Sequence, residues 1–290
     1  MLRRGVFVTV IIMGILSILE IVRELHGFVV KDYTITTNKL NGLNGELRAV
    51  FLSDLHNKSY GKDNEELISA IKAARPDLIL ITGDMLVAKR HTKYDQALPL
   101  LTKLPEIAPV YMSNGNHEQR LKDEPEKYGD FSEYKAQLLK AGIHLLENES
   151  EYINLYGARI KITGLELHES TYKKIGCPHL TKADMEACVG PADAQSYQVL
   201  LAHNPAFFEA YKNWGADLTL SGHLHGGVVR IPGWRGIITP QLRLFPKYSG
   251  EMTAEAERVI VVSRGLGTHT VHLRLFNQAE MIVLHFTGES

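Results

Sequence analysis

Short apolar runs, each followed by polar residues that can bind metal, constrain the fold of this chain more than any other feature. The runs are Ala49–Leu52, Leu78–Ile81, Val110–Met112, Val199–Ala202 and Leu218–Leu220. Uninterrupted apolar runs of this length, bounded by turn residues, are typical of buried strands. Open α/β sheets place their chemistry just beyond the carboxyl ends of the strands. We therefore expect an α/β fold with its functional groups gathered at one edge.

The polar residues after these runs form an ordered series of oxygen and nitrogen ligands. They are Asp54, His56, Asp84, Asn116, His117, His203, His223 and His225. Imidazole and carboxylate groups together suit divalent ions such as Mn, Fe, Zn or Ni. Residues two apart on a strand share a face, and both Asp54/His56 and His223/His225 have that spacing. The series predicts a site for two metal ions, and its lack of thiolates excludes a structural zinc finger.

Each piece of the series taken alone has an ordinary structural explanation. Asp54 and His56 alone would be explained by a hydrogen-bonded pair, and Gly115–Glu118 alone by a turn. Five such pieces in order at strand ends favour a common site. A zinc protease would instead need a His-Glu-x-x-His helix, which the sequence lacks.

The segments between the strands carry helical patterns. Asn64–Arg75 has apolar residues at helical spacing and is stopped by Pro76. With the strands on either side, Leu47–Ser53 and Leu78–Ile81, it predicts a parallel strand–helix–strand unit. Further helices are expected at Ser132–Ala141, ended by Gly142, and from Asn204 through Trp214.

The pattern changes after Gly226, where glycine, proline and aromatic residues become frequent. We expect a long loop beside the site, followed by antiparallel strands of a second sheet at Val259–Ser263 and Met281–Phe286. The loop charges are Arg230, Arg235, Arg243 and Lys247. They could hold a substrate anion or be solvated. The apolar residues of the loop could line a groove for acyl chains or belong to the core.

The N-terminus predicts a membrane anchor over residues 1–26. Two arginines precede an uncharged stretch from Gly5 to Leu19, which is slightly short of a bilayer span. A cleaved signal peptide and a buried core helix are the alternatives. Arg3 and Arg4 favour an N-in orientation at the cell membrane, with the catalytic domain outside the cytoplasm. Residues 27–46 are expected to be a linker with a possible edge strand at Tyr33–Thr37.

The composition argues against two classes of site, one for nucleic acid and one for a cysteine-bound zinc ion. The net charge is −1 and no long basic stretch occurs, which argues against nucleic acid. The two cysteines, Cys177 and Cys188, lack the spacing of a zinc knuckle. They are either plain thiols or one disulfide.

The ligand series resembles the signature of the calcineurin-like metallophosphoesterase superfamily: D-x-H, G-D, G-N-H-[DE], H and G-H-x-H. The resemblance covers residues 48–286. The N-terminal anchor and the Ser263–Gly267 segment look like its bacterial membrane-associated (YkuE/YaeI-like) branch. The resemblance to the superfamily implies a four-layer α/β/β/α sandwich over residues 47–290, preceded by the anchor helix.

The resemblance also implies roles for the site residues. One ion would be bound by Asp54, His56, Asp84 and His225, and the second by Asp84, Asn116, His203 and His223. His117 would contact the substrate and protonate the leaving oxygen. Two divalent ions would supply a bridging hydroxide for in-line attack on phosphorus. Mn is the first expectation for both ions, with Fe, Zn or Ni allowed.

The sequence also departs from the family pattern. Many relatives carry an aspartate three residues after that of Gly-Asp, where this chain has Val87. This makes a protein Ser/Thr phosphatase unexpected and leaves open what orients His117. The implied function is a phosphodiesterase acting on phosphodiester or pyrophosphate bonds near the membrane. The alternatives are a UDP-2,3-diacylglucosamine-type pyrophosphatase, a phospholipid phosphoesterase, or a tethered scaffold without turnover; no substrate-binding residue is assigned.

Overall fold

Two six-stranded sheets form the centre of the molecule in this computed structural model. It describes residues 2–90, 92, 94, 96–173, 178–227, 229–231, 236–238, 245–268 and 272–289. The first sheet contains, in spatial order, β1 (Phe28–Thr36), β14 (Ala279–Thr287), β2 (Leu47–Leu52), β3 (Leu78–Ile81), β4 (Val110–Met112) and β5 (His144–Leu145). The second contains β12 (Met252–Glu255), β13 (Arg258–Val262), β9 (Leu218–Ser221), β8 (Tyr197–Ala202), β7 (Ala158–Leu165) and β6 (Ser150–Leu155). β10 (Val229–Arg230) and β11 (Gly236–Ile238) form a separate small ribbon.

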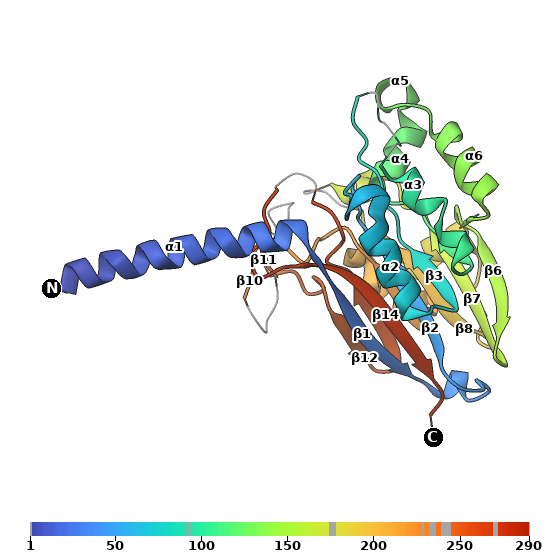
Figure 1. Cartoon of the computed structure of the whole chain (residues 1–290). Coiled ribbons are helices and arrows are strands. Elements are labelled where there is room, and N and C mark those ends of the chain that lie inside the picture. The colour runs from blue at the N-terminus through green and yellow to red at the C-terminus, as the bar shows by residue number, and fades with distance from the viewer. Residues whose placement is uncertain are drawn as a thin grey trace.

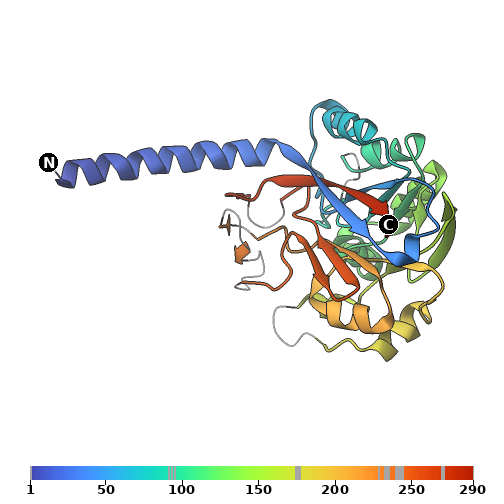
Figure 2. The same cartoon turned by 90° about the horizontal axis from the view of Figure 1, so that it is seen from below.

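Helices cover the outer faces of both sheets. The α-helices are α1 (Leu2–His26), α2 (Glu65–Ala74), α3 (Leu98–Leu101), α4 (Asn116–Asp123), α5 (Pro125–Tyr128), α6 (Phe131–Ala141), α7 (Lys182–Val189) and α8 (Phe208–Trp214). The short 3-10 turns are η1 (Asn38–Leu40), η2 (Lys62–Asn64), η3 (Leu104–Glu106), η4 (Glu169–Tyr172) and η5 (Pro205–Phe207). Figure 2 shows α2, in cyan, and the yellow to orange helices on opposite sides of the sheets.

The central strands are buried at nearly every position, because both faces of each sheet are covered. On β2, Val50 and Leu52 join the core under α2, α3 and α6, while Ala49 and Phe51 pack between the two sheets. A third core, containing Phe208 of α8, closes the outer face of the second sheet. The order is therefore helix, sheet, sheet, helix, as the family resemblance implies.

Most elements expected from the sequence lie where they were predicted. β3 and β4 have the predicted bounds, and β2, β8 and β9 differ by a few residues. β2 and β3 are parallel, with α2 between them in the chain. Gly142 ends α6 in a left-handed conformation (φ 92°), and the Asn204 side chain accepts from the N–H of Ala206 at the start of η5.

The predictions for the ends of the chain need correction. β14, expected in the second sheet, lies in the first, antiparallel to β2 and parallel to β1. β13 does join the second sheet, where it runs antiparallel to β12 and parallel to β9. The segment expected to be a linker, residues 27–46, contains β1, a nine-residue strand at the edge of the first sheet that includes most of the edge strand expected at Tyr33–Thr37. Strand pairing depends on contacts distant in sequence, which a local pattern does not encode.

The helix α1 projects from the body of the molecule (Figure 1). Its apolar side chains from Phe7 to Val22 include many that are 45–66% exposed. Among the residues that the structure describes, none of the helices combines the length and apolarity needed to cross a membrane. The anchor expected over residues 1–26 is not confirmed by this finding and stays a prediction.

Candidate metal centre

The loops after five strands bring the predicted ligand residues to one edge of the two sheets. Asp54 and His56 follow β2, Asp84 follows β3, and Asn116 begins α4 after β4. From the second sheet, His203 follows β8, and His223 and His225 follow β9. The side chains form overlapping groups whose ligand atoms lie within 4.8 Å of one another: Asp54, His56 and His225; His56, Asp84 and His117; Asp84, His203 and His223.

Five of these residues have a left-handed backbone. The φ angles are 52° for Asp54, 49° for His56, 53° for Asp84, 70° for His223 and 51° for His225. This region costs a residue with a Cβ roughly 1 kcal/mol or more, and such strain collects at functional sites. In the loop after β2, this conformation turns the chain sharply, which lets Asp54 and His56 reach the same point.

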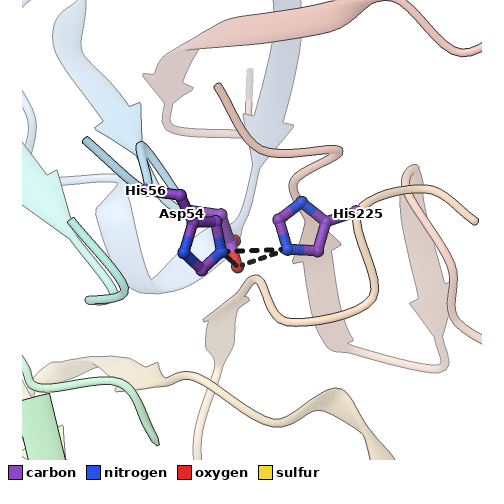
Figure 3. A group of neighbouring side chains, drawn as sticks. All are labelled: Asp54, His56 and His225. Carbon is purple, nitrogen blue, oxygen red and sulfur yellow. Dashed lines mark hydrogen bonds and ion pairs between the residues drawn. The ribbon is translucent and has the colours of Figure 1, made fainter. Parts of the chain in front are cut away.

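The first group is drawn in Figure 3, where the two imidazoles approach the Asp54 carboxylate. His56 Nε2 lies 3.6 Å and His225 Nε2 3.4 Å from Asp54 Oδ1. The two Nε2 atoms lie 3.1 Å apart, with the rings stacked. Three donor atoms at these spacings can all bind a single cation.

The second group is centred on Asp84. His203 Nε2 lies 3.2 Å from Asp84 Oδ2 and 3.8 Å from Asp54 Oδ1. His203 Nδ1 lies 2.7 Å from the carbonyl oxygen of Thr82. That carbonyl accepts only, so Nδ1 carries a proton, and in the neutral ring the lone pair of Nε2 faces the carboxylates. Asp84 Oδ2 also lies 3.8 Å from His56 Nε2, so Asp84 stands between the two groups.

The electrostatics of the site fit a bound cation. Burial raises the pKa of Asp54 and of Asp84, but nearby imidazoles outweigh it and lower both below the usual range of a carboxyl group. The imidazoles with the largest effect are His225 and then His203 for Asp54, and His203 for Asp84. Burial opposes protonation of His203, yet the two carboxylates raise its pKa to about 9. Burial is the main cause that lowers the pKa of His223 and His225 to about 3, so both rings are neutral and able to bind metal.

Asn116 supplies a separate test of metal binding. Its Oδ1 is buried and has no hydrogen-bond partner in the described part of the chain. A buried acceptor of this kind costs about 1–3 kcal/mol unless something pairs with it. Carboxylates, imidazoles and this amide oxygen together form a donor set that divalent transition metals accept. The residues present therefore fit the metal ions that the family implies.

Glu118 holds the loops of Asp84 and Asn116 together, a role that the sequence analysis missed. Its Oε2 accepts from the N–H groups of Asp84 (2.8 Å) and Gly115 (3.0 Å), and its Oε1 accepts from the N–H of Met85 (2.9 Å). Burial and the nearby Asp84 raise the pKa of Glu118 to about 7. A glutamate three residues after a helix N-cap is a capping-box signal, which could have indicated this role.

The backbone orients His117 where the family's additional carboxylate is missing. The N–H of Ala88 donates to His117 Nδ1 at 2.9 Å. Because Nδ1 accepts this bond, the neutral ring carries its proton on Nε2. That Nε2 lies 4.0 Å from Asp84 Oδ2, facing the ligand cluster. The question left open by the sequence, what orients His117, is answered by a backbone group.

Other side chains near the site differ from expectation. The ring of Tyr172 packs edge-on to His223 at 4.9 Å, which no sequence pattern indicated. Arg230 is buried and donates to the carbonyl of Gly226 and to Glu251, so it supports the loop rather than facing solvent. Lys247 is exposed and pairs with Glu255. Arg235, Arg243 and Cys177 lie outside the described residues, and Cys188 is exposed.

Comparisons with known proteins agree with this geometry. The family model for calcineurin-like phosphoesterases matches residues 47–227. The uncharacterized metallophosphoesterase YkuE of Bacillus subtilis is 28% identical over 265 residues, which cover 90% of this chain and 86% of YkuE. Phosphodiesterase YaeI of Escherichia coli is 27% identical, with 82% of this chain and 81% of YaeI covered. The UDP-2,3-diacylglucosamine pyrophosphatase LpxG of Chlamydia muridarum is 21% identical, with 82% and 83% covered.

The match to the family model spans more than half of the chain and includes every strand end that carries a predicted ligand. The described Asp and His side chains at those ends form overlapping groups of carboxylates and imidazoles. The chain therefore belongs to the calcineurin-like phosphoesterase family and is a metal-dependent phosphoric ester hydrolase.

Proposed function

We propose that this chain is a phosphodiesterase that cleaves phosphodiester or pyrophosphate bonds of substrates close to a membrane. The observation that carries the proposal is the convergence of ligands from both sheets on Asp84, with His117 directed at the same point. A scaffold without turnover would not need to keep so many strained, buried ligand positions.

The proposed ion ligands follow the two clusters. Asp54, His56, Asp84 and His225 would hold one divalent ion, and Asp84, Asn116, His203 and His223 the other. Once bound, such ions activate water and offset the negative charge of the phosphoryl group. Mn²⁺ is our first choice for both ions, and Fe, Zn and Ni are compatible with the same donors.

His117 acts on the leaving group in this proposal. The Ala88 N–H fixes the tautomer, so Nε2–H is directed into the site. A hydrogen bond from Nε2 to the leaving oxygen stabilises the charge that develops there as the ester bond breaks. Glu118 and Thr82 do not touch the substrate; they hold the Asp84 loop and His203 in position.

The membrane part of the proposal rests on α1. Its apolar side chains are exposed, and an apolar helix surface of this extent is a candidate for insertion into lipid. Arg3 and Arg4 at its start favour a cytoplasmic N-terminus, with the catalytic domain outside. One similar protein from Danio rerio is named a transmembrane protein with metallophosphoesterase domain, and LpxG is named for a lipid substrate. A lipid-linked pyrophosphate or a phospholipid is accordingly the substrate class we propose.

The test of the hydrolase uses the full chain, stripped of metal and reloaded with Mn²⁺. We expect bis-p-nitrophenyl phosphate to be cleaved faster than p-nitrophenyl phosphate, and Asp84→Asn to abolish turnover while the protein stays folded. The side chain of Glu124, which lies directly before α5, is 42% exposed and gives a matched control, Glu124→Gln, with unchanged turnover. Undiminished activity in Asp84→Asn would remove the metal-pair mechanism.

The membrane proposal has its own test, flotation of the full chain with vesicles of neutral phospholipid. We expect binding, and we expect it to be lost when Ile11, Ile15 and Ile18 are replaced by serine. Hydrolysis of the soluble ester should be unchanged in this variant, because none of the three residues contacts the site. Equal flotation of both proteins would contradict the role assigned to α1.

A further inference from the structure

The last turn of α1 meets the body of the protein beside the metal ligands. Glu24 lies in this turn and is only 2% exposed, although most of the helix is open to solvent. Its two carboxylate oxygens accept from the backbone N–H of Asn277, at 3.1 and 2.9 Å. A buried carboxylate with a backbone donor is a fixed contact, and it joins α1 to the segment before β14.

Asn277 continues this connection into the Gly-His-Leu-His-Gly loop. It is fully buried, and its Nδ2 donates to the carbonyl of His225 at 2.7 Å and to the carbonyl of Gly227. Gly226 between them has φ 69°, and a Cβ there would lie 2.3 Å from Asn277 Oδ1. The loop is thus wrapped closely around the Asn277 amide, with the His225 carbonyl fixed directly.

Two further contacts tie the same end of α1 to the loop of Asp54. Lys58, two residues after His56, donates its Nζ to the carbonyl of Leu25 in α1. Arg274 is buried and donates to the carbonyls of Asn277 (2.9 Å) and Gly267 (2.7 Å). The N–H of Gly267 in turn donates to the Asp54 carbonyl at 2.6 Å.

These contacts have a common consequence. We propose that Glu24 is a positioning residue for the metal centre: it holds Asn277, which fixes the loop that carries His225. The N-terminal helix is then part of the framework of the site, in addition to any role at a membrane. The inference rests on the proposed function in one respect, the assignment of His225 as a metal ligand.

The sequence offers a matched control one helical turn away. Glu20 is also on α1 and pairs with Arg23 on the exposed surface, but contacts neither Asn277 nor the ligand loops in any described interaction. Glu24→Ala removes both acceptors of the Asn277 N–H. Glu24→Gln keeps one acceptor and turns an amide N–H toward the same donor. Glu20→Ala removes a carboxylate that lies beside Glu24, but it leaves both acceptors of the Asn277 N–H in place.

The experiment measures Mn²⁺ binding to the full chain by electron paramagnetic resonance, together with thermal unfolding in EDTA. We expect the wild type and Glu20→Ala to bind two ions that give the spectrum of a spin-coupled pair. In Glu24→Ala, one ion should bind about tenfold more weakly, because loss of an outer contact to a metal ligand weakens metal binding by that order. The coupled spectrum should then give way to isolated Mn²⁺ at intermediate metal concentrations, with a smaller effect in Glu24→Gln.

Other outcomes overturn the inference in distinguishable ways. A variant that unfolds at lower temperature in EDTA but binds both ions as the wild type does would show a purely structural role for Glu24. If Glu24→Ala does not fold, Glu24→Gln decides between the two results by the same measurement. A wild-type chain that binds no Mn²⁺, or one ion only, would remove the two-metal proposal and this inference with it.

Discussion

Replacing Glu118 with glutamine tests the three hydrogen bonds that join the Asp84 and Asn116 loops. The amide keeps one acceptor oxygen, so at least one of the N–H groups of Asp84, Met85 and Gly115 loses its partner. An orphaned buried donor costs about 1–3 kcal/mol, and exchange of a charged acceptor for a neutral one costs about 1 kcal/mol per remaining bond. Removing the charge repulsion between Glu118 and Asp84 offsets part of this loss. The free energy of unfolding should therefore fall by about 2 kcal/mol.

The presence of metal changes the expected magnitude. When bound cations neutralise Asp84, the offsetting repulsion is smaller, so Glu118→Gln should destabilise the metal-loaded protein more than the metal-free protein. We would measure the free energy of unfolding by urea denaturation in EDTA and in saturating Mn²⁺, with Glu124→Gln as the exposed control. Equal losses under both conditions, or a loss below about 0.5 kcal/mol in both, would refute the role given to Glu118.

Three further predictions follow from other contacts. His117→Ala should slow cleavage of alkyl phosphodiesters by about 10²–10⁴-fold and that of p-nitrophenyl esters less, because p-nitrophenolate leaves without assistance; equal losses for both leaving groups would contradict the assignment. Gly83→Ala should cost 3 kcal/mol or more in urea denaturation, since φ is 83° and a Cβ would lie 2.0 Å from the Gly115 nitrogen, whereas Gly14→Ala, with nothing within 4 Å, should be tolerated. His285→Gln should destabilise the protein by about 0.5 kcal/mol near pH 5.5 and by less at pH 9. Hydrogen bonds, first to Asp32 and then to Glu46, raise the pKa of His285 in the folded protein. The stabilisation by the charged ring is therefore complete below the ordinary pKa of 6.5 and is lost as the pH rises through the pKa of the folded state. A difference from wild type that does not change with pH would contradict this last prediction.

The sequence predicts the elements whose physical cause is local. β3 and β4 have the expected bounds because strands buried on both faces must be apolar at every position. The helix after Asn204 begins as predicted because the asparagine side chain and Pro205 act within one turn. The ligands Asp54, Asp84 and His203 converge because strand ends meet at one edge of each sheet, and that rule needs no knowledge of the remaining topology.

The parts that could not be predicted depend on contacts between distant segments or on the backbone. β14 was placed in the wrong sheet because its partners, β1 and β2, lie more than 200 residues away in the chain. The group that orients His117 is an N–H of Ala88, and every residue except proline has such a group. Asn277 lies in a segment of mixed polar and apolar residues without a motif, and only the fold brings it beside His225.

The pairing of β1 with β14 has a consequence for how the chain is made. Phe28 pairs with Ala279 and Thr36 with Thr287, so these parallel partners are separated by 251 positions at each pair. During synthesis on a ribosome, β1 emerges early and has no partner on that side of the sheet until β14 follows. Contacts between residues so far apart in the sequence slow folding. An unpaired strand edge beside an apolar helix is prone to aggregate. A nascent chain stalled before residue 279 should therefore need a chaperone to stay soluble.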